Sequence, residues 1–309
     1  MKLIKPKFWN KKNNFLSFLL FPISLFLQIL ILIKKKITFK NIFKIPVICV
    51  GNIYLGGTGK TPLSIFIAHE LTKHKKHPAI IKKFYKQHLD EHNLIKSDFK
   101  NLFLDSKRAN AINKAENQGY DVIILDDGFQ DFSIKKDLNI LCFNSKQMIG
   151  NEMTLPSGPL RQPMNVIKQT KIVLINGEKN LLLEKKIIDI SKEVKIFYSK
   201  YIPTNIKDFK DEKIFAFAGI GNPENFFSTL SAHNVDIGRE KSFPDHYNFN
   251  KNELLKLIDE SFKYNLQLVT TEKDYFRIKD YGFNQIKYLK TQLHIQKKDE
   301  FINEILNYI

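Results

Sequence analysis

The chain has 309 residues, enough for two α/β domains that each bury a core. Its apolar content of 43% is ordinary for a globular protein, whereas its net charge of +17 is not. That charge points to an anionic partner, either a nucleic acid, an acidic membrane surface or a phosphorylated substrate. Cys49 and Cys142 lie in apolar, strand-like runs, so we interpret them as core residues and exclude a disulfide or a metal site.

The first predicted element is an apolar helix within residues 1–37. Residues 15–33 form a run of 19 without a charge, flanked by lysines. Such a helix is about 28 Å long, close to the hydrocarbon thickness of a bilayer. A cleaved signal peptide does not fit, because no small-residue cleavage site follows. A buried core helix would carry more polar residues than Ser17, Ser24 and Gln28, so we expect a membrane-embedded or membrane-surface helix.

A phosphate cradle is predicted next. The apolar run 45–50 indicates a buried parallel strand, and a glycine-rich turn and an amphipathic helix follow it. Lys60 would reach the β- and γ-phosphates of ATP, and the Thr61 hydroxyl would bind Mg²⁺. Tyr54 replaces the first glycine of the usual pattern, and the alternative is a turn that binds nothing. The predicted nucleotide-binding residues are Gly56, Gly57, Thr58, Gly59, Lys60 and Thr61.

A polar stretch follows the second predicted strand, which begins at residues 78–81. This stretch, 82–100, contains Asp90 and Glu91. A polar loop after a strand of an α/β sheet lies at the edge of the sheet that faces the ligand. A helix is then expected over residues 109–118.

The second chemical motif is YDVIILDDGFQ at residues 120–130. Its four apolar residues predict a strand that ends in Asp126 and Asp127. A strand that delivers carboxylates to the P-loop side of the sheet holds or orients Mg²⁺ in P-loop enzymes. The alternative is an Asp-Asp-Gly turn that only ends the strand.

A rigid loop with three prolines, LPSGPLRQP, occupies residues 155–163 between buried strands expected at 138–143 and 172–175. Its Arg161 could clamp a phosphate with both guanidinium nitrogens. The alternative is a surface arginine on a turn.

The character of the chain changes near residues 200–211, where we place a domain boundary. We expect a P-loop domain over 38–205 and a smaller α/β domain over 206–309. A strand is expected at 214–218, followed by the turn GIGNP. That turn has neither a GxGxxG spacing nor a Gly-Lys pair, so we interpret it as structural.

Two candidate site residues lie in this C-terminal part. His246 follows Asp245 in the aromatic stretch FPDHYNF, and an acidic neighbour can orient or tune a histidine for proton transfer. The alternative is a histidine packed in an aromatic loop. Lys273 follows a strand expected at 266–271 and is a candidate phosphate or substrate contact.

In this order the motifs resemble the tetraacyldisaccharide 4'-kinases, the lipid A 4'-kinases of Gram-negative bacteria. Together with the apolar N-terminal helix, they extend over nearly the whole chain. The segments that carry the resemblance are GNIYLGGTGKTP (51–62), LDDGFQ (125–130), LPSGPLRQP (155–163), AGIGNPENFF (218–227), FPDHYNF (243–249) and TTEKD (270–274).

The resemblance implies transfer of the γ-phosphate of ATP, with Mg²⁺, to the 4'-hydroxyl of a tetraacylated glucosamine disaccharide 1-phosphate. It implies an α/β fold with a P-loop NTPase-like sheet covered by helices on both faces, a smaller C-terminal α/β domain that closes the active-site cleft, and an N-terminal membrane helix. The partners would be this lipid A precursor and the cytoplasmic face of the inner membrane, without a nucleic acid.

The resemblance also implies catalytic roles. LDEHNLI at 89–95 is similar to the family's motif with a catalytic aspartate, which assigns that role to Asp90, supported by His246 and Lys60. One departure is clear. Where the family usually has a Ser-Arg-Gly-Tyr-Gly turn, this chain has Lys-Lys-Phe-Tyr-Lys at 82–86.

Two other functions remain open at this point. A P-loop GTPase or partition-type ATPase would act as a switch, but TEKD at 271–274 has an extra residue before the lysine and does not fit the guanine-reading motif. A membrane protein of the family with altered catalysis is the other alternative, because of the changed residues 82–86.

Overall fold

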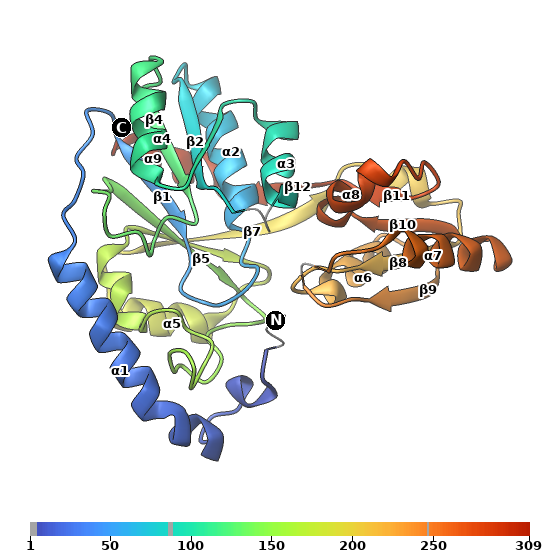
Figure 1. The fold of residues 1–309 in the computed structure, drawn as a ribbon, viewed down its shortest axis with the longest axis horizontal. Helices are drawn as coiled ribbons and strands as arrows, with labels where there is room; N and C mark the ends of the chain where they lie inside the picture. Colours follow the sequence, from blue (N-terminus) through green and yellow to red (C-terminus); the bar gives the residue numbers. More distant parts are fainter. Residues whose placement is uncertain (1–4, 86–88, 246) are drawn as a thin grey trace. The chain divides into compact units, whose positions relative to one another are not determined.

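The structure, a computed structural model, describes residues 5–85, 89–245 and 247–309, and only the backbone of Leu89 and Asp90. The chain forms two compact units (Figure 1). The P-loop unit comprises Leu3–Phe84, Phe99–Lys200 and His294–Ile309. The second unit is built from Tyr85–Asp98 and Tyr201–Leu293.

An eight-stranded sheet forms the centre of the P-loop unit, with the strand order β12-β7-β6-β5-β1-β4-β2-β3. Every pair of neighbouring strands between β7 and β3 in this order is parallel. The strands are β1 (Val47–Gly51), β2 (Pro78–Lys83), β3 (Leu102–Asp105), β4 (Val122–Asp126), β5 (Leu138–Asn144), β6 (Ile172–Asn176), β7 (Lys195–Pro203) and β12 (Thr291–Ile295).

The helices of this unit connect these strands or flank them. They are η1 (Lys7–Asn10), α1 (Phe15–Ile37), α2 (Lys60–Lys73), α4 (Arg108–Asn117), η3 (Met164–Gln169), α5 (Leu181–Ile190) and α9 (Lys298–Leu306). The helix expected over 109–118 is therefore confirmed.

Alternate residues of the central strands pack against different helices. Val47 and Cys49 of β1 share a core cluster with Ala111 of α4 and Leu183 of α5. Because successive side chains of a strand point to opposite faces, Ile48 and its even-numbered neighbours face the other side, where α2 packs. The predicted sheet with helices on both faces is confirmed.

Cys49 and Cys142 are buried and free, as predicted. Burial raises the pKa of the Cys49 thiol to about 11 and that of the Cys142 thiol to about 12. Both thiols therefore stay protonated at neutral pH and act as small apolar side chains.

The second unit contains a four-stranded sheet with the order β11-β10-β8-β9, whose pairs are all parallel. Its strands are β8 (Ile214–Ala218), β9 (Ile237–Ser242), β10 (Gln267–Thr271) and β11 (Lys287–Leu289). Its helices are α3 (Leu89–Asp98), η4 (Ile206–Phe209), α6 (Pro223–Ala232), α7 (Lys251–Lys263), α8 (Glu272–Ile278) and η5 (Lys279–Tyr281).

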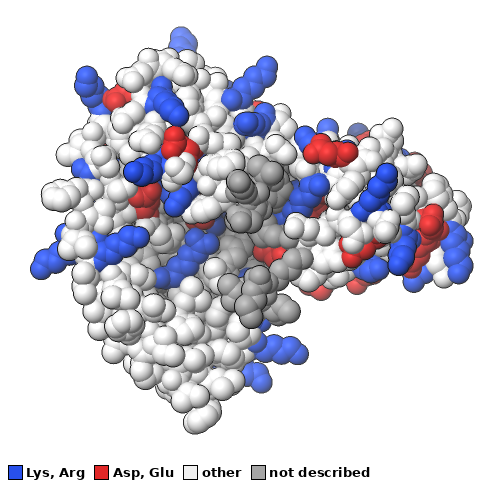
Figure 2. Space-filling view, in the orientation of Figure 1, with Lys and Arg blue, Asp and Glu red and all other residues white. Residues whose placement is uncertain are grey.

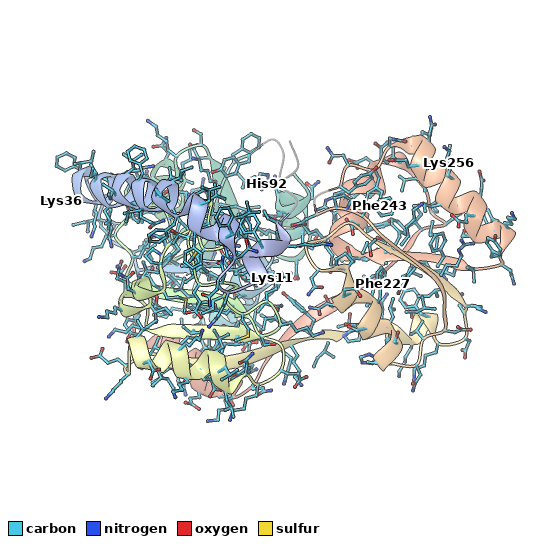
Figure 3. All side chains as sticks on the ribbon, turned by 90° about the horizontal axis from the view of Figure 1, so that it is seen from below. Lys11, Lys36, His92, Phe227, Phe243 and Lys256 are labelled. Carbon is cyan, nitrogen blue, oxygen red and sulfur yellow. The ribbon has the colours of Figure 1, made fainter. Side chains whose placement is uncertain are left out.

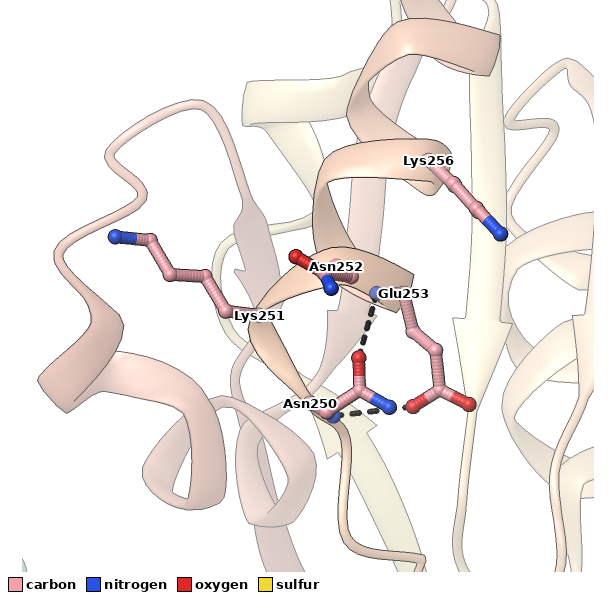
Figure 4. Close-up of a pocket in the computed structure, with 5 residues that line it drawn as sticks. All are labelled: Asn250, Lys251, Asn252, Glu253 and Lys256. Atoms are coloured by element: carbon pink, nitrogen blue, oxygen red, sulfur yellow. Dashed lines mark hydrogen bonds between the residues drawn. The ribbon is translucent and has the colours of Figure 1, made fainter.

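Helix α7 begins with a reciprocal cap, which Figure 4 shows in close-up. The Asn250 side chain accepts a hydrogen bond of 2.8 Å from the Glu253 N–H, and the Glu253 carboxylate accepts one of 3.0 Å from the Asn250 N–H. The shallow hollow at this helix start is lined by the cap residues, Lys251, Asn252 and Lys256. These hydrogen bonds satisfy the helix terminus, so the polar groups of Asn250 and Glu253 that line the hollow already serve as the cap of α7.

The structure differs from the sequence-based description in two segments. Residues 82–100 were expected as a loop, but α3 occupies most of them, because Ile95 and His92 bury one side of this helix and α3 packs against α8. This packing places 85–98 in the second unit. Residues 294–309 were assigned to the C-terminal domain, yet they belong to the P-loop unit because Phe301 of α9 packs against Phe66 of α2.

Helix α1 is apolar and exposed. Its exposed side chains include Phe15 (76%), Leu19 (62%) and Leu32 (64%), whereas Ser17 and Ser24 are its only buried residues. In Figure 2 the surface over this helix carries few charges. In Figure 3, Lys36 lies in the last turn of α1 and Lys11 lies before the helix begins.

Candidate active site

The turn between β1 and α2 is held open by one buried asparagine that the sequence analysis missed. Asn52 Nδ2 donates hydrogen bonds to the carbonyl oxygens of Tyr54 and Gly56 and to Thr58 Oγ1, over 2.8, 3.1 and 3.0 Å. Gly59 has a φ of +90°, which side chains other than hydrogen disfavour. The glycine-rich loop thus leads directly into the N-terminus of α2, with Gly59 as its N-cap, which is the arrangement that binds phosphate.

Thr61 and Asp126 meet at the carboxyl edge of the sheet. Thr61 Oγ1 donates a hydrogen bond of 2.9 Å to Asp126 Oδ2, and Ser64 Oγ donates one of 3.3 Å to Asp126 Oδ1. Lys82 Nζ also donates to Asp126 Oδ2. Because β4 lies beside β1 with Asp126 in register with Val50, the fold brings this carboxylate to the P-loop.

Asp127 lies among positive charges. Lys60 Nζ is 3.7 Å from its Oδ1, and Arg161 Nη1 is 3.3 Å from Oδ1 and 3.4 Å from Oδ2. Burial favours a raised pKa for this carboxyl, but the charges of Lys60, Arg161, Lys82 and Arg108 outweigh it and hold the pKa below its usual range. Asp127 is therefore ionised at neutral pH.

Asp127 also has a left-handed backbone, with a φ of +54°. Arg108 Nη2 donates a hydrogen bond of 2.7 Å to its carbonyl oxygen, and Arg108 Nη1 pairs with Asp131 over 3.2 Å. Arg108 lies at the start of α4, where no motif marked it, and only the fold brings it to this turn.

Among the described residues, no three His, Cys, Asp or Glu side chains form a metal cage. Mg²⁺ does not need one, because it keeps several waters and is held by one or two carboxylates together with substrate phosphates. The hydroxyl of Thr61 and the carboxylate of Asp126 are hard oxygen ligands 2.9 Å apart, and they fit such a site. Both carboxylates contact cations, Asp127 through Lys60 and Arg161 and Asp126 through Lys82, but Asp126 is the one that accepts the hydrogen bond of the Thr61 hydroxyl.

Arg161 links this cluster to α1. A hollow lined by Leu27, Leu30 and Ile31 of α1 and by Leu155 also includes Arg161. Nearby, Ser24 Oγ lies within hydrogen-bonding distance of Thr154 O (3.0 Å) and Ser157 Oγ (2.7 Å) and accepts a hydrogen bond from Ser157 N, so the loop around 154–157 is attached to the helix. Arg161 therefore lines a hollow together with apolar residues, Gln28 and Lys34 of α1, rather than lying on an isolated surface turn.

In the second unit, Lys273 occupies the first turn of α8 and lies 3.4 Å from Glu91 of α3. Its neighbour Asp274 is fully buried and accepts hydrogen bonds of 2.8 Å from Gly219 N and from Thr271 Oγ1. Arg277 pairs with the same carboxylate. Asp274 thus fixes the Gly219 turn, which supports the interpretation of that turn as structural.

The structure does not describe the side chains of the other two predicted catalytic residues. His246 lies outside the described residues. Asp90 is the second residue of α3, but its side chain is not described. Both segments, 85–98 and 201–293, belong to the second unit, whereas Asp90 was expected in the P-loop domain.

The comparisons with known proteins agree with the motifs. A model of the family described as tetraacyldisaccharide-1-P 4'-kinase matches residues 16–98 and 87–309. The chain belongs to this family. A tetraacyldisaccharide 4'-kinase of Pelagibacter ubique (strain HTCC1062) is 43% identical over 310 residues, which are 99% of this chain and 98% of that protein. One from Rickettsia typhi is 33% identical, with 98% of each chain covered.

A solved structure supports the fold. The LpxK protein of Aquifex aeolicus, determined in complex with ATP, matches with a TM-score of 0.70 at 21% identity. The match covers 95% of this chain and 99% of that one. The LpxK protein of Aquifex aeolicus thus shares the fold of this chain.

Proposed function

We propose that this chain is an ATP-dependent kinase that phosphorylates the 4'-hydroxyl of a tetraacyldisaccharide 1-phosphate in lipid A synthesis. The observation that carries the proposal is the cluster of Lys60, Thr61, Asp126 and Asp127 around the P-loop of a member of the 4'-kinase family. Phosphoryl transfer needs positioning and charge neutralisation more than covalent chemistry, and this cluster supplies both.

Each residue of the cluster has a distinct role in this proposal. The turn at Gly56, Gly57, Thr58 and Gly59 would cradle the phosphates of ATP, and Lys60 would leave Asp127 to follow the γ-phosphate. Thr61 and Asp126 would hold Mg²⁺, which neutralises charge on the phosphates when it is bound. Arg161 and Lys273 would hold phosphate groups of the nucleotide or of the lipid.

The sugar hydroxyl must lose a proton to attack the phosphate. We assign the proton acceptor to Asp90 and its support to His246, on the resemblance of their motifs to those of the family.

We further propose that α1 lies in the cytoplasmic surface of the inner membrane. Asn151 Nδ2 donates a hydrogen bond of 2.9 Å to Ser17 Oγ, and Ser24 holds the loop around 154–157. A helix fastened to polar loops along one side cannot be surrounded by lipid, because those loops would lose water for their backbone groups. Its apolar side would enter one leaflet, as in amphipathic surface helices.

The hollow between α1 and Arg161 would then open towards the lipid. Its apolar lining suits an acyl chain, and Arg161 suits an anionic group at its end. This arrangement would deliver a membrane-bound acceptor to the charged cluster.

The test uses full-length protein, radiolabelled ATP and purified tetraacyldisaccharide 1-phosphate in detergent micelles. We expect label in the lipid, at the 4'-position, and only with a divalent ion present. ATP hydrolysis without labelled lipid would instead identify a nucleotide switch. Binding of ATP with neither reaction would identify a family member with altered catalysis.

A further inference from the structure

Lys82 contacts the predicted metal ligand Asp126, and the proposed function gives it no role. It lies on β2 in register with Asp126 of the neighbouring parallel strand β4. Residues in register on parallel strands point to the same face, so both side chains point towards α2 and Thr61. Lys82 is the first residue of the segment where the family usually has a serine-initiated turn.

The ammonium group of Lys82 is enclosed with the two proposed metal ligands. Its Nζ donates to Asp126 Oδ2 and lies 3.5 Å from Thr61 Oγ1, and these two oxygens are 2.9 Å apart. Lys82 is 5% exposed and Asp126 is 0% exposed. A positive charge thus sits against the same pair of oxygens that would bind the divalent ion.

A buried carboxylate is stable only beside a positive charge or full hydrogen bonding. In the protein without nucleotide, Lys82 meets this need for Asp126. A second cation at the same oxygens would meet strong repulsion, because charges a few ångströms apart in a protein interior are poorly screened. Either the ammonium moves away or the metal binds weakly.

Resting on the proposed Mg·ATP site, we propose that Lys82 is a built-in cation that competes with the divalent ion for Thr61 and Asp126. The protein without nucleotide keeps this pair neutralised by Lys82. The divalent ion binds to Thr61 and Asp126 only when the phosphates of ATP add negative charge and attract the Lys82 ammonium away from these oxygens. Lys82 therefore couples metal binding to nucleotide binding.

The test measures Mn²⁺ binding to the full-length protein without nucleotide, by electron paramagnetic resonance, because Mn²⁺ replaces Mg²⁺ at oxygen sites. Lys82→Ser, which introduces the residue usual in the family, should lower the Kd for Mn²⁺ at least ~10-fold, since it removes the competing charge. Lys82→Met should do the same while keeping the apolar stem. Lys82→Arg retains the charge and should bind Mn²⁺ as weakly as the wild type.

Lys83→Ser is the matched position control. Lys83 is the next residue of the same strand, points to the opposite face, and should leave the Kd unchanged. Equal Mn²⁺ affinities in wild type, Lys82→Ser and Lys82→Met would overturn the proposal.

Thermal unfolding provides a second measurement, which remains informative if Lys82→Ser or Lys82→Met folds poorly. The Tm of Lys82→Ser and Lys82→Met should rise on adding Mg²⁺ without nucleotide, whereas the wild-type Tm should hardly change. If Mg²⁺ neither raises the Tm of Lys82→Ser and Lys82→Met nor refolds them, Lys82 does not compete with the divalent ion. Binding of a non-hydrolysable ATP analogue to the wild type is measured alongside. If that binding is absent, the proposed kinase function fails; if it is present with unchanged Mn²⁺ affinities, only the role of Lys82 fails.

Discussion

Lys60 Nζ lies 3.7 Å from Asp127 Oδ1, so the P-loop lysine rests on a carboxylate from the end of β4. The two residues come from different elements, and they meet because β4 pairs with β1 at the centre of the sheet. The carboxylate keeps the lysine at the mouth of the P-loop. Phosphates that bind at the P-loop must therefore compete with the Asp127 carboxylate for Lys60.

The first prediction concerns Lys60. Lys60→Ala should lower kcat by at least ~10², the scale of losing one preorganised electrostatic stabiliser of the transition state. The measurement is the transfer of radiolabel from ATP to the lipid acceptor. Lys100→Ala, which changes an exposed lysine of the same unit, is the control and should retain wild-type turnover. Near-normal turnover of Lys60→Ala would rule out the P-loop as the phosphate site.

The second prediction concerns Asp90 and His246. Each alanine variant should lower kcat strongly and change ATP affinity little, because a proton acceptor acts in the transition state. If the two residues act as a unit, the double variant should lose much less than the product of the single losses. The measurement is a double-mutant cycle on kcat with saturating ATP. Independent, multiplicative losses would separate the two residues.

The third prediction concerns the membrane helix. Deleting residues 1–36 should move the protein from the membrane to the soluble fraction and leave part of its ATP affinity, because α1 supplies the exposed apolar surface while the P-loop lies outside it. Sedimentation at low and high salt measures the release. A deleted protein that stays membrane-bound at high salt would place the anchor elsewhere in the chain.

The fourth prediction concerns acid stability through Glu70 of α2. Burial favours a raised pKa for this carboxyl, but Lys73 and Lys298 outweigh it and lower the pKa below 4.5. A lowered folded-state pKa means that the stabilisation is complete above pH 4.5 and is lost as the pH falls through the lower, folded value. Glu70→Gln should therefore reduce the free energy of unfolding by ~1 kcal/mol at pH 7 and flatten its decline at acid pH.

Chemical denaturation at pH 7 and at several values below pH 4.5 measures this effect. Glu193→Gln is the matched control, because Glu193 forms an exposed pair with Lys171 and should leave the curve unchanged. A wild-type acid profile in Glu70→Gln would show that the contacts of Glu70 with Lys73 and Lys298 contribute nothing to stability.

The local elements of the site were predictable from the sequence. The strand before the P-loop, the helix after it, and the strand that ends in Asp126 have strong patterns of their own, and the structure confirms all three. The burial of Cys49 followed from its apolar run. What these predictions share is that each depends on residues within one short window.

Contacts between distant segments were not predictable. Asn52 and Arg108 act on the turn only because the fold brings Thr58 and Asp127 to them. Nothing in the sequence distinguishes Lys82 from the other lysines. Its burial beside Asp126 follows from the pairing of β2 with β4, which only the structure shows. The helical nature of 89–98 was missed because its apolar side is short and is completed by packing against α8.

The return of the chain to the P-loop unit has a consequence for its synthesis. Gln296 N donates a hydrogen bond of 2.9 Å to Tyr198 O, and Phe301 of α9 lies 5.2 Å from the ring of Phe197. The second unit is thus largely an insertion between β7 and α9, which join side by side. A truncation before residue 294 would therefore remove the contacts of α9 with β7 and leave the nucleotide-binding body incomplete, even though every P-loop residue is present.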